Sequence, residues 1–139
     1  MKPKGYYRRT LGLLRPRALR KKLVVIIGQG SGGSHFSLHL GQLGVQMTLV
    51  ERPDELLLEH NVIRHVLGYD SLSKPKLTAM ADCIRRLYPS AQVRTVEMDV
   101  TAQKDELAKL VAQHRPDLIA ALEVKAEPEA ANRGAGQAR

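Results

Sequence analysis

Short aliphatic runs alternate with segments of helical periodicity over most of the chain. The first run, 23–27, is entirely aliphatic and ends at Gly28, which is typical of a strand buried on both faces of a parallel sheet. Further strands are expected over 47–50, 93–98 and 118–122, and helices over 34–43, 75–88 and 105–114. In the last two helices, apolar residues at helical spacing would face the core: Leu77, Met80, Ile84, Leu87, Leu107, Leu110 and Val111.

The order of these elements predicts an α/β fold. One β-α-β unit is followed by a leucine-rich insertion over 55–68, where we expect short helical turns, and then by α-β-α-β. Right-handed crossovers place the strands in the order 3-2-1-4 with helices on both faces. The sequence therefore predicts a Rossmann-like three-layer sandwich with a mostly parallel sheet, whose ligands bind at the carboxyl ends of the strands.

Charge is distributed unevenly along the chain. The 139 residues carry a formal net charge of +8, and nine Lys or Arg but no Asp or Glu fall within residues 1–22. We therefore divide the chain into a basic N-terminal arm (1–22), a domain (23–124) and a tail (125–139) whose Ala-, Glu- and Gly-rich composition predicts disorder. Five leucines of the arm and its junction would share one helical stripe, interrupted by Pro16: Leu11, Leu13, Leu14, Leu19 and Leu23.

Composition excludes several classes of protein. Hydrophobic residues make up 43% and charged residues 26% of the chain, which is ordinary for a globular protein. A single cysteine rules out an internal disulfide framework and a cysteine zinc cluster, and no apolar run is long enough to cross a bilayer. We expect a cytoplasmic protein with neither a membrane nor a nucleic acid as partner, because the domain itself is nearly neutral and no nucleic-acid motif accompanies the arm.

The strongest chemical signal is a glycine loop, Gly28-x-Gly30-x-x-Gly33, between the first strand and the first domain helix. In such loops the first glycine permits a sharp turn, the second lets a phosphate approach the backbone, and the third lets helix and strand pack closely. The free amides of a helix N-terminus then attract an anion. Glu51, at the end of the second strand, would accept hydrogen bonds from a ribose diol. Alternatively, the loop binds no nucleotide, and its glycines only allow the helix and the strand to pack closely.

Two cationic residues, Arg64 and Lys76, favour one class of nucleotide over another. Arg64 follows Asn61 by three residues, and Lys76 begins the helix after Pro75. Projected over the glycine loop, the two cations would neutralise the charge of a triphosphate and of the pyrophosphate that leaves it. A dinucleotide has less need of two such cations, because it carries only two bridging phosphates. Taken singly, Arg64 and Lys76 are typical solvated cations, and Asn61 is a typical helix cap.

Four segments together resemble the ThiF/MoeB adenylyltransferases, the bacterial relatives of ubiquitin-activating enzymes. These are Val25–Ser34, Thr48–Glu51, Asn61–Arg64 and Ser73–Lys76, in that family's order and approximate spacing. The resemblance implies an enzyme that binds ATP with Mg2+. In it, the C-terminal carboxylate of a ubiquitin-like or sulfur-carrier protein attacks the α-phosphorus, an acyl-adenylate forms and pyrophosphate leaves.

The resemblance also implies nine nucleotide contacts: Gly28, Gly30, Ser31, Gly33, Glu51, His60, Asn61, Arg64 and Lys76. The glycines and the serine would line the phosphate and adenosine side, and Glu51, where the family usually has Asp, would hold the ribose. Asn61 would contact the phosphates with His60 beside it. Arg64 and Lys76 are the catalytic candidates, because they would stabilise charge on the phosphates during transfer.

The chain departs from the family pattern at its C-terminal side. The family's magnesium-binding aspartate is expected near Val124, where the neighbouring Glu123 is a weak substitute, and we identify no protein metal ligand. The later half of the family's fold is absent, so we expect an apparently truncated nucleotide-binding half of an adenylating domain. Two other hypotheses stay open, an NAD(P)-binding oxidoreductase fragment and a non-catalytic binding module that uses the arm. A homodimer is left open as well.

Overall fold

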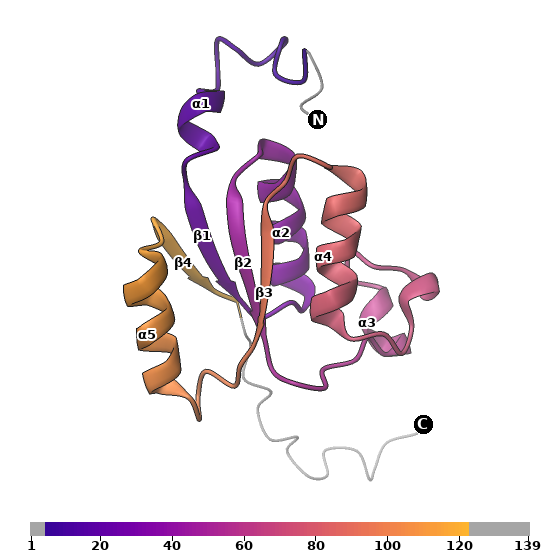
Figure 1. Cartoon of the computed structure of the whole chain (residues 1–139). Coiled ribbons are helices and arrows are strands. Elements are labelled where there is room, and N and C mark those ends of the chain that lie inside the picture. Colours follow the sequence, from indigo (N-terminus) through magenta and orange to yellow (C-terminus); the bar gives the residue numbers. More distant parts are fainter. Residues whose placement is uncertain (1–4, 123–139) are drawn as a thin grey trace, which may run out of the picture.

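The computed structural model describes residues 5–122 and contains a four-stranded sheet flanked by helices (Figure 1). In chain order, the elements are α1 (Pro16–Leu19), β1 (Leu23–Ile27), α2 (Ser31–Leu43), β2 (Gln46–Glu51), α3 (Glu59–Val62), the 3-10 turn η1 (Tyr69–Ser71), α4 (Lys76–Leu87), β3 (Val93–Glu97), α5 (Lys104–His114) and β4 (Leu118–Ala121). The segment expected to form short helical turns contains α3, with η1 directly after it. The tail predicted over 125–139 lies outside the described residues.

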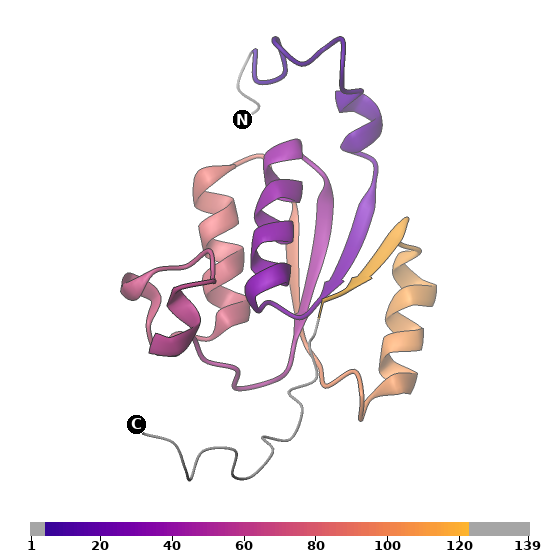
Figure 2. The same cartoon turned by 180° about the vertical axis from the view of Figure 1, so that it is seen from behind.

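The sheet has the predicted topology. Its strand order is β3-β2-β1-β4, and all three strand pairs are parallel. Helices α2 and α4 cover one face and α5 lies on the other (Figures 1 and 2). The prediction of a Rossmann-like three-layer α/β sandwich with strand order 3-2-1-4 is therefore confirmed.

Strand β1 is aliphatic throughout because it supplies two cores. Val24 and Ile26 pack with the α2 and α4 side, whereas Val25 and Ile27 pack with Leu110 of α5. These four β1 side chains are 0–5% exposed. Full burial of a Val or Ile side chain stabilises a fold by roughly 1.5–3 kcal/mol, so this strand anchors the loop that follows it.

Helix α2 begins earlier than its apolar periodicity predicts. It starts at Ser31 rather than at Ser34, with Gly30 as its N-cap, so the second half of the glycine loop is already the first helical turn. Its end is as predicted, because Gly44 has a φ of +82° and closes the helix in the left-handed conformation. The early start matters because the first amides of a helix have no intrahelical acceptor.

One expectation about an apolar face is wrong. Leu87 is 48% exposed, because it is the last residue of α4. In the arm, the leucine stripe is interrupted at Pro16 as expected, because the residues before it form turns and α1 begins at Pro16, where the missing N–H has no cost. Leu11 and Leu13 are 64% and 86% exposed.

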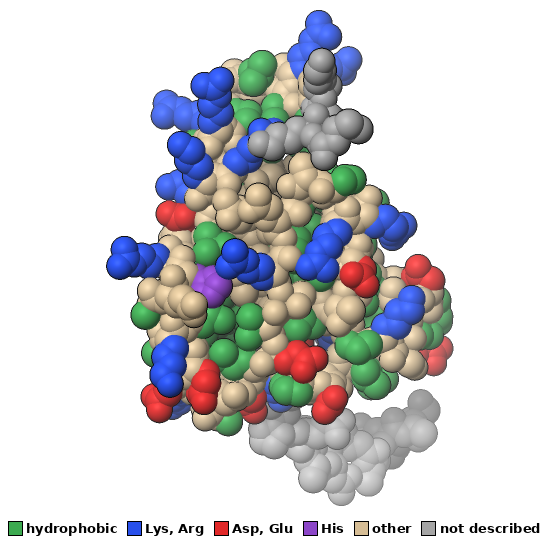
Figure 3. All heavy atoms as spheres, in the orientation of Figure 1, with side chains coloured by type: hydrophobic (Ala, Val, Ile, Leu, Met, Phe, Trp, Pro, Cys, Tyr) green, Lys and Arg blue, Asp and Glu red, His purple; other side chains and the backbone are tan. Residues whose placement is uncertain are grey.

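The arm is attached to the domain at the far end of α2. The hydroxyl of Tyr7 donates to the carbonyl of Leu43 at 2.8 Å, and the hydroxyl of Tyr6 donates to the carbonyl of Gln42. Basic side chains gather at this end of the molecule (Figure 3). Within 5–122, no helix combines the length and the apolar character that a membrane crossing needs.

Candidate functional site

A pocket of about 330 Å3 lies where the glycine loop follows β1, at the carboxyl end of the sheet. Its volume is at the lower end of the range of small-molecule sites. The lining residues are Gly28, Gly30, Ser31, Gly32, Glu51, Arg52, Glu55, Asn61, Arg64, His65, Lys76 and Leu122. The pocket therefore combines the glycine loop with residues from β2, α3, α4 and the segments between them.

The three glycines of the loop have different geometric roles. Gly28 has a φ of +92°, a conformation that side chains with a Cβ rarely adopt. A Cβ on Gly33 would lie 1.7 Å from the carbonyl oxygen of Gly28, whereas a Cβ on Gly30 would meet nothing within 4 Å. Gly33 thus permits the close helix-strand contact, and the space over Gly30 is part of the pocket.

Glu51 lies at the pocket with both carboxylate oxygens already in use. It is 5% exposed, and it accepts the backbone N–H of Gln29 at 2.7 Å and that of Arg52 at 2.9 Å. Each carboxylate oxygen can accept a second hydrogen bond. Glu51 therefore holds the glycine loop against the end of β2, and it retains acceptor capacity for a hydroxyl group.

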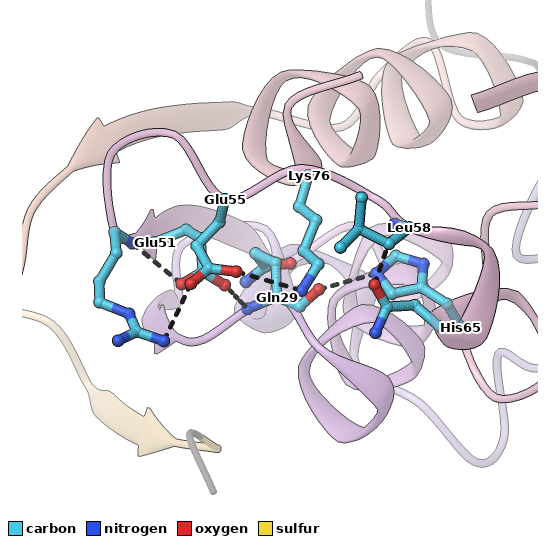
Figure 4. Close-up of polar contacts among 8 residues, drawn as sticks. Gln29, Glu51, Glu55, Leu58, His65 and Lys76 are labelled. Atoms are coloured by element: carbon cyan, nitrogen blue, oxygen red, sulfur yellow. Dashed lines mark hydrogen bonds and ion pairs between the residues drawn. The ribbon is translucent and has the colours of Figure 1, made fainter. Parts of the chain in front are cut away.

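Lys76 is the first residue of α4, and its side chain is only 12% exposed. Its Nζ lies 3.4 Å from Oε2 of Glu55, whose other oxygen lies 2.9 Å from the guanidinium of Arg52 (Figure 4). A cation at a helix N-terminus is disfavoured by the helix dipole, so helix stability does not account for Lys76. An antiparallel bridge between Leu56 and Pro75 holds the lysine at the pocket.

Arg64 and Asn61 reach the same pocket from the segment that contains α3. The carbonyl of Arg64 accepts the hydroxyl of Ser31 at 3.0 Å, which ties this segment to the start of α2. Oδ1 of Asn61 accepts the backbone N–H of Leu58 at 3.0 Å, so the capping role considered above is present. The residue lines the pocket as well, and its amide nitrogen is a further donor.

Two of the nine predicted contacts are not among the lining residues. Gly33 is buried beneath the loop, and His60 is exposed on α3. Another histidine, His65, lines the pocket instead. The lining residues that were not predicted are Gly32, Arg52, Glu55, His65 and Leu122. Arg52 and Leu122 directly follow β2 and β4, and this position could have indicated a role, because loops at the carboxyl edge of a sheet form its ligand site. Nothing in the sequence distinguishes Glu55 or His65 from their neighbours in this way.

A larger hollow, of about 720 Å3, lies within the arm and is lined by residues between Gly5 and Arg20. It contains none of the glycine loop, so the smaller pocket is the better candidate for nucleotide chemistry. Among residues 5–122, no group of three or more His, Cys, Asp or Glu is arranged to hold a metal ion.

A model of the ThiF family matches residues 7–122. The chain belongs to the ThiF family. It is 36% identical over 101 residues to a Pseudomonas aeruginosa (strain BWHPSA011 / Pa011) protein named ATP-dependent ubiquitin transferase-like protein Cap2, a match that covers 68% of this chain and 18% of that protein. A protein of the same name from Enterobacter hormaechei subsp. hoffmannii is 35% identical over 77 residues, or 55% of this chain and 13% of the relative. The chain spans less than a fifth of the length of these two relatives.

Solved structures share the fold at lower identity. The Escherichia coli tRNA N6-threonylcarbamoyladenosine dehydratase TcdA, in complex with ATP, superposes with a TM-score of 0.74 at 21% identity, over 89% of this chain and 49% of that one. Escherichia coli MccB with ATP superposes with a TM-score of 0.66 at 21% identity, over 78% of this chain and 35% of that one. The family resemblance of the sequence is therefore confirmed, and the fold is that of ThiF-type adenylyltransferases.

Proposed function

We propose that this chain binds ATP in the pocket at the carboxyl end of the sheet. The observation that carries the proposal is that Arg64 and Lys76, twelve positions apart in sequence, line one pocket with the glycine loop. Open space over Gly30, next to the first amides of α2, suits a phosphate group. Two cations beside those amides suit a triphosphate better than the two bridging phosphates of a dinucleotide.

The lining residues divide by chemistry. Glu51 accepts a ribose hydroxyl with the capacity left over from its two backbone hydrogen bonds. Lys76 and Arg64 contact the phosphates, and on ATP binding the Lys76 amine exchanges Glu55 for a phosphate oxygen. Asn61 donates from its amide nitrogen. Gly33 acts through the packing of the loop rather than by contact with nucleotide.

Magnesium fits the described residues poorly. The two carboxylates at the pocket are Glu51, which accepts two backbone amides, and Glu55, which pairs with Arg52 and Lys76. Magnesium usually keeps several waters and binds through substrate phosphates with one or two carboxylates. The positions at which the sequence suggested a ligand, Glu123 and Val124, lie outside the described residues.

We further propose that the protein to which this chain corresponds adenylates the C-terminal carboxylate of a ubiquitin-like or sulfur-carrier protein. A carboxylate oxygen attacks the α-phosphorus, the bond from that phosphorus to the bridging oxygen breaks, and the products are an acyl-adenylate and pyrophosphate. Arg64 and Lys76 stabilise the charge that moves onto the departing pyrophosphate. A cytoplasmic location and a homodimer belong to this proposal as well. Support comes from family membership and from the name of the Cap2 relatives.

Binding is tested by isothermal titration with ATP. Lys76→Ala is expected to weaken affinity by about 10- to 100-fold, because a hydrogen bond to a charged group contributes roughly 1.5–3 kcal/mol. Arg64→Ala changes affinity in the same direction. Lys74→Ala, two positions away and exposed, is the matched control and leaves affinity unchanged. Equal affinities for Lys76→Ala and Lys74→Ala contradict the proposal.

Lys76→Ala also leaves the Glu55 carboxylate without its amine partner. The same lysine change is therefore measured in a Glu55→Gln background, where repulsion between a freed carboxylate and ATP cannot contribute. A parallel titration with NADH distinguishes the ATP-binding proposal from the oxidoreductase hypothesis. Tight NADH binding that is indifferent to Lys76 supports that hypothesis and contradicts ours. Pyrophosphate exchange into ATP, dependent on an added carrier protein, tests adenylation separately.

A further inference from the structure

Residues 64–67 are joined to the glycine loop and the start of α2 by four hydrogen bonds. Besides the hydroxyl of Ser31, the His35 ring donates from Nε2 to the carbonyl of Arg64 at 3.2 Å. The backbone N–H of Val66 donates to the hydroxyl of Ser34 at 3.3 Å. The fourth joins Nε2 of His65 to the carbonyl of Gln29 at 2.7 Å. Among these bonds, the one from His65 is the bond that ends on a backbone carbonyl of the glycine loop, that of Gln29.

The partners of His65 identify its tautomer. Nδ1 accepts the backbone N–H of Leu67 at 3.0 Å, so the ring proton is on Nε2. From there it is donated to the carbonyl of Gln29, a bond that Figure 4 shows. Leu67 and His65 are 6% and 7% exposed. A buried N–H without an acceptor costs about 1–3 kcal/mol. The neutral ring therefore satisfies one buried donor and one carbonyl at once, and a protonated ring cannot do so.

The carbonyl of Gln29 and the N–H of Gly30 belong to one planar peptide and point in opposite directions. The preceding N–H, that of Gln29, is fixed by Glu51. Fixing the carbonyl therefore fixes the direction of the Gly30 amide, which lies at the open part of the pocket. We propose that His65 is a positioning residue whose neutral imidazole orients the glycine-loop amides, so that its protonation lowers the affinity of the pocket for ATP. This inference rests on the proposed function of the pocket.

The surroundings of His65 favour the neutral ring. Burial is the main cause that lowers the pKa of His65 below its usual 6.5, and the nearby cation Lys76 from α4 and the ring of His35 from α2 add to this. The carbonyl of Gln29 and the carboxylate of Glu51 from β2 act in the opposite direction. Because the folded-state pKa is lowered, the stabilisation is complete above pH 6.5 and is lost as the pH falls through the lowered value.

The test compares the wild-type chain with His65→Gln, since glutamine keeps a donor and an acceptor but does not titrate. ATP affinity is measured from pH 8 to pH 5, within the range where circular dichroism finds both proteins folded. The ratio of the two dissociation constants is the readout, because protonation of ATP itself cancels in it. The ratio at pH 8 is the reference, and as the pH falls below 6.5 the wild type is expected to weaken relative to the variant, by up to about tenfold per pH unit as the ring becomes protonated. A ratio independent of pH overturns the inference.

Two further measurements separate the sources of such an effect. His35→Gln removes the other imidazole of this region, and a pH dependence that disappears in this variant rather than in His65→Gln also overturns the inference. The second measurement needs no ATP. The 15N-resolved amide signal of Gly30 is followed against pH, and it is expected to titrate in the wild type but not in His65→Gln.

A titrating Gly30 signal in a protein that binds no ATP supports the positioning role and refutes the proposed function. A Gly30 signal that is unaffected by pH refutes the positioning role, whatever the affinity for ATP.

Discussion

The contact between Gly33 and Gly28 allows a sharp test of the glycine loop. A Cβ at position 33 would lie 1.7 Å from the carbonyl oxygen of Gly28 and 2.8 Å from its carbonyl carbon. Ordinary van der Waals contact begins near 3.4 Å, so α2 would have to move away from the end of β1 by about 1.7 Å. Both atoms belong to the backbone, and no side-chain rotation can relieve the overlap. We expect Gly33→Ala to lower the free energy of unfolding by about 3 kcal/mol, at the upper end for overpacking.

The matched control is Gly32→Ala, one position earlier in the same helix. A Cβ there meets nothing within 4 Å, and alanine forms helix more readily than glycine by up to about 1 kcal/mol. The two variants are therefore expected to shift stability in opposite directions. Urea unfolding followed by circular dichroism at 222 nm measures both. If Gly33→Ala is as stable as Gly32→Ala, the close contact does not constrain the loop and the reasoning is refuted.

Two further predictions concern the pocket and the arm. Glu55→Gln removes a negative charge that now pairs with Lys76, and we expect ATP to bind about two- to fivefold more tightly in isothermal titration; weaker binding means instead that Glu55 is needed to hold the lysine in place. Tyr7→Phe removes the hydroxyl that donates to the carbonyl of Leu43 and is expected to lower the free energy of unfolding by about 1 kcal/mol in urea. Tyr69→Phe, at a side chain 65% exposed, is its control, and equal losses in the two variants contradict a specific role for the Tyr7 hydroxyl.

The topology could be predicted from the sequence because local and global signals agree. A continuous aliphatic strand, a glycine loop and alternating helices leave one right-handed arrangement, which the structure has. The meeting of Arg64 and Lys76 could be anticipated for the same reason, since segments that follow parallel strands reach the same edge of a sheet. What could not be predicted is which neighbouring polar residues join them.

Glu55 and His65 illustrate that limit. Glu55 reaches Lys76 through the bridge between Leu56 and Pro75, and no periodic pattern encodes a bridge of one residue pair. His65 reaches Gln29 only because its segment crosses the start of α2. His60, five positions earlier, is the same residue type in the same segment and is exposed on α3. Residue type and spacing alone do not distinguish these two histidines, whereas the path of the backbone does.

The early start of α2 has a different cause. Residues 31–33 contain two glycines, whose helix propensity is low, and a pattern of apolar residues therefore places the helix start later. The close approach of Gly33 to Gly28 outweighs that propensity, since a side chain at this position would prevent it. Tertiary contact rather than local preference sets the first turn.

The opposite placement of the arm and the pocket has a practical consequence. The basic residues of 5–22 come before β1 and lie at its amino end, whereas the glycine loop comes after β1 and lies at its carboxyl end (Figures 1 and 3). On a negatively charged bead or sensor chip, the molecule will adsorb by its arm at low salt. The face that carries Gly30 and Lys76 is then turned toward the bulk solution, so immobilised protein can be screened for ligands without a covalent tether.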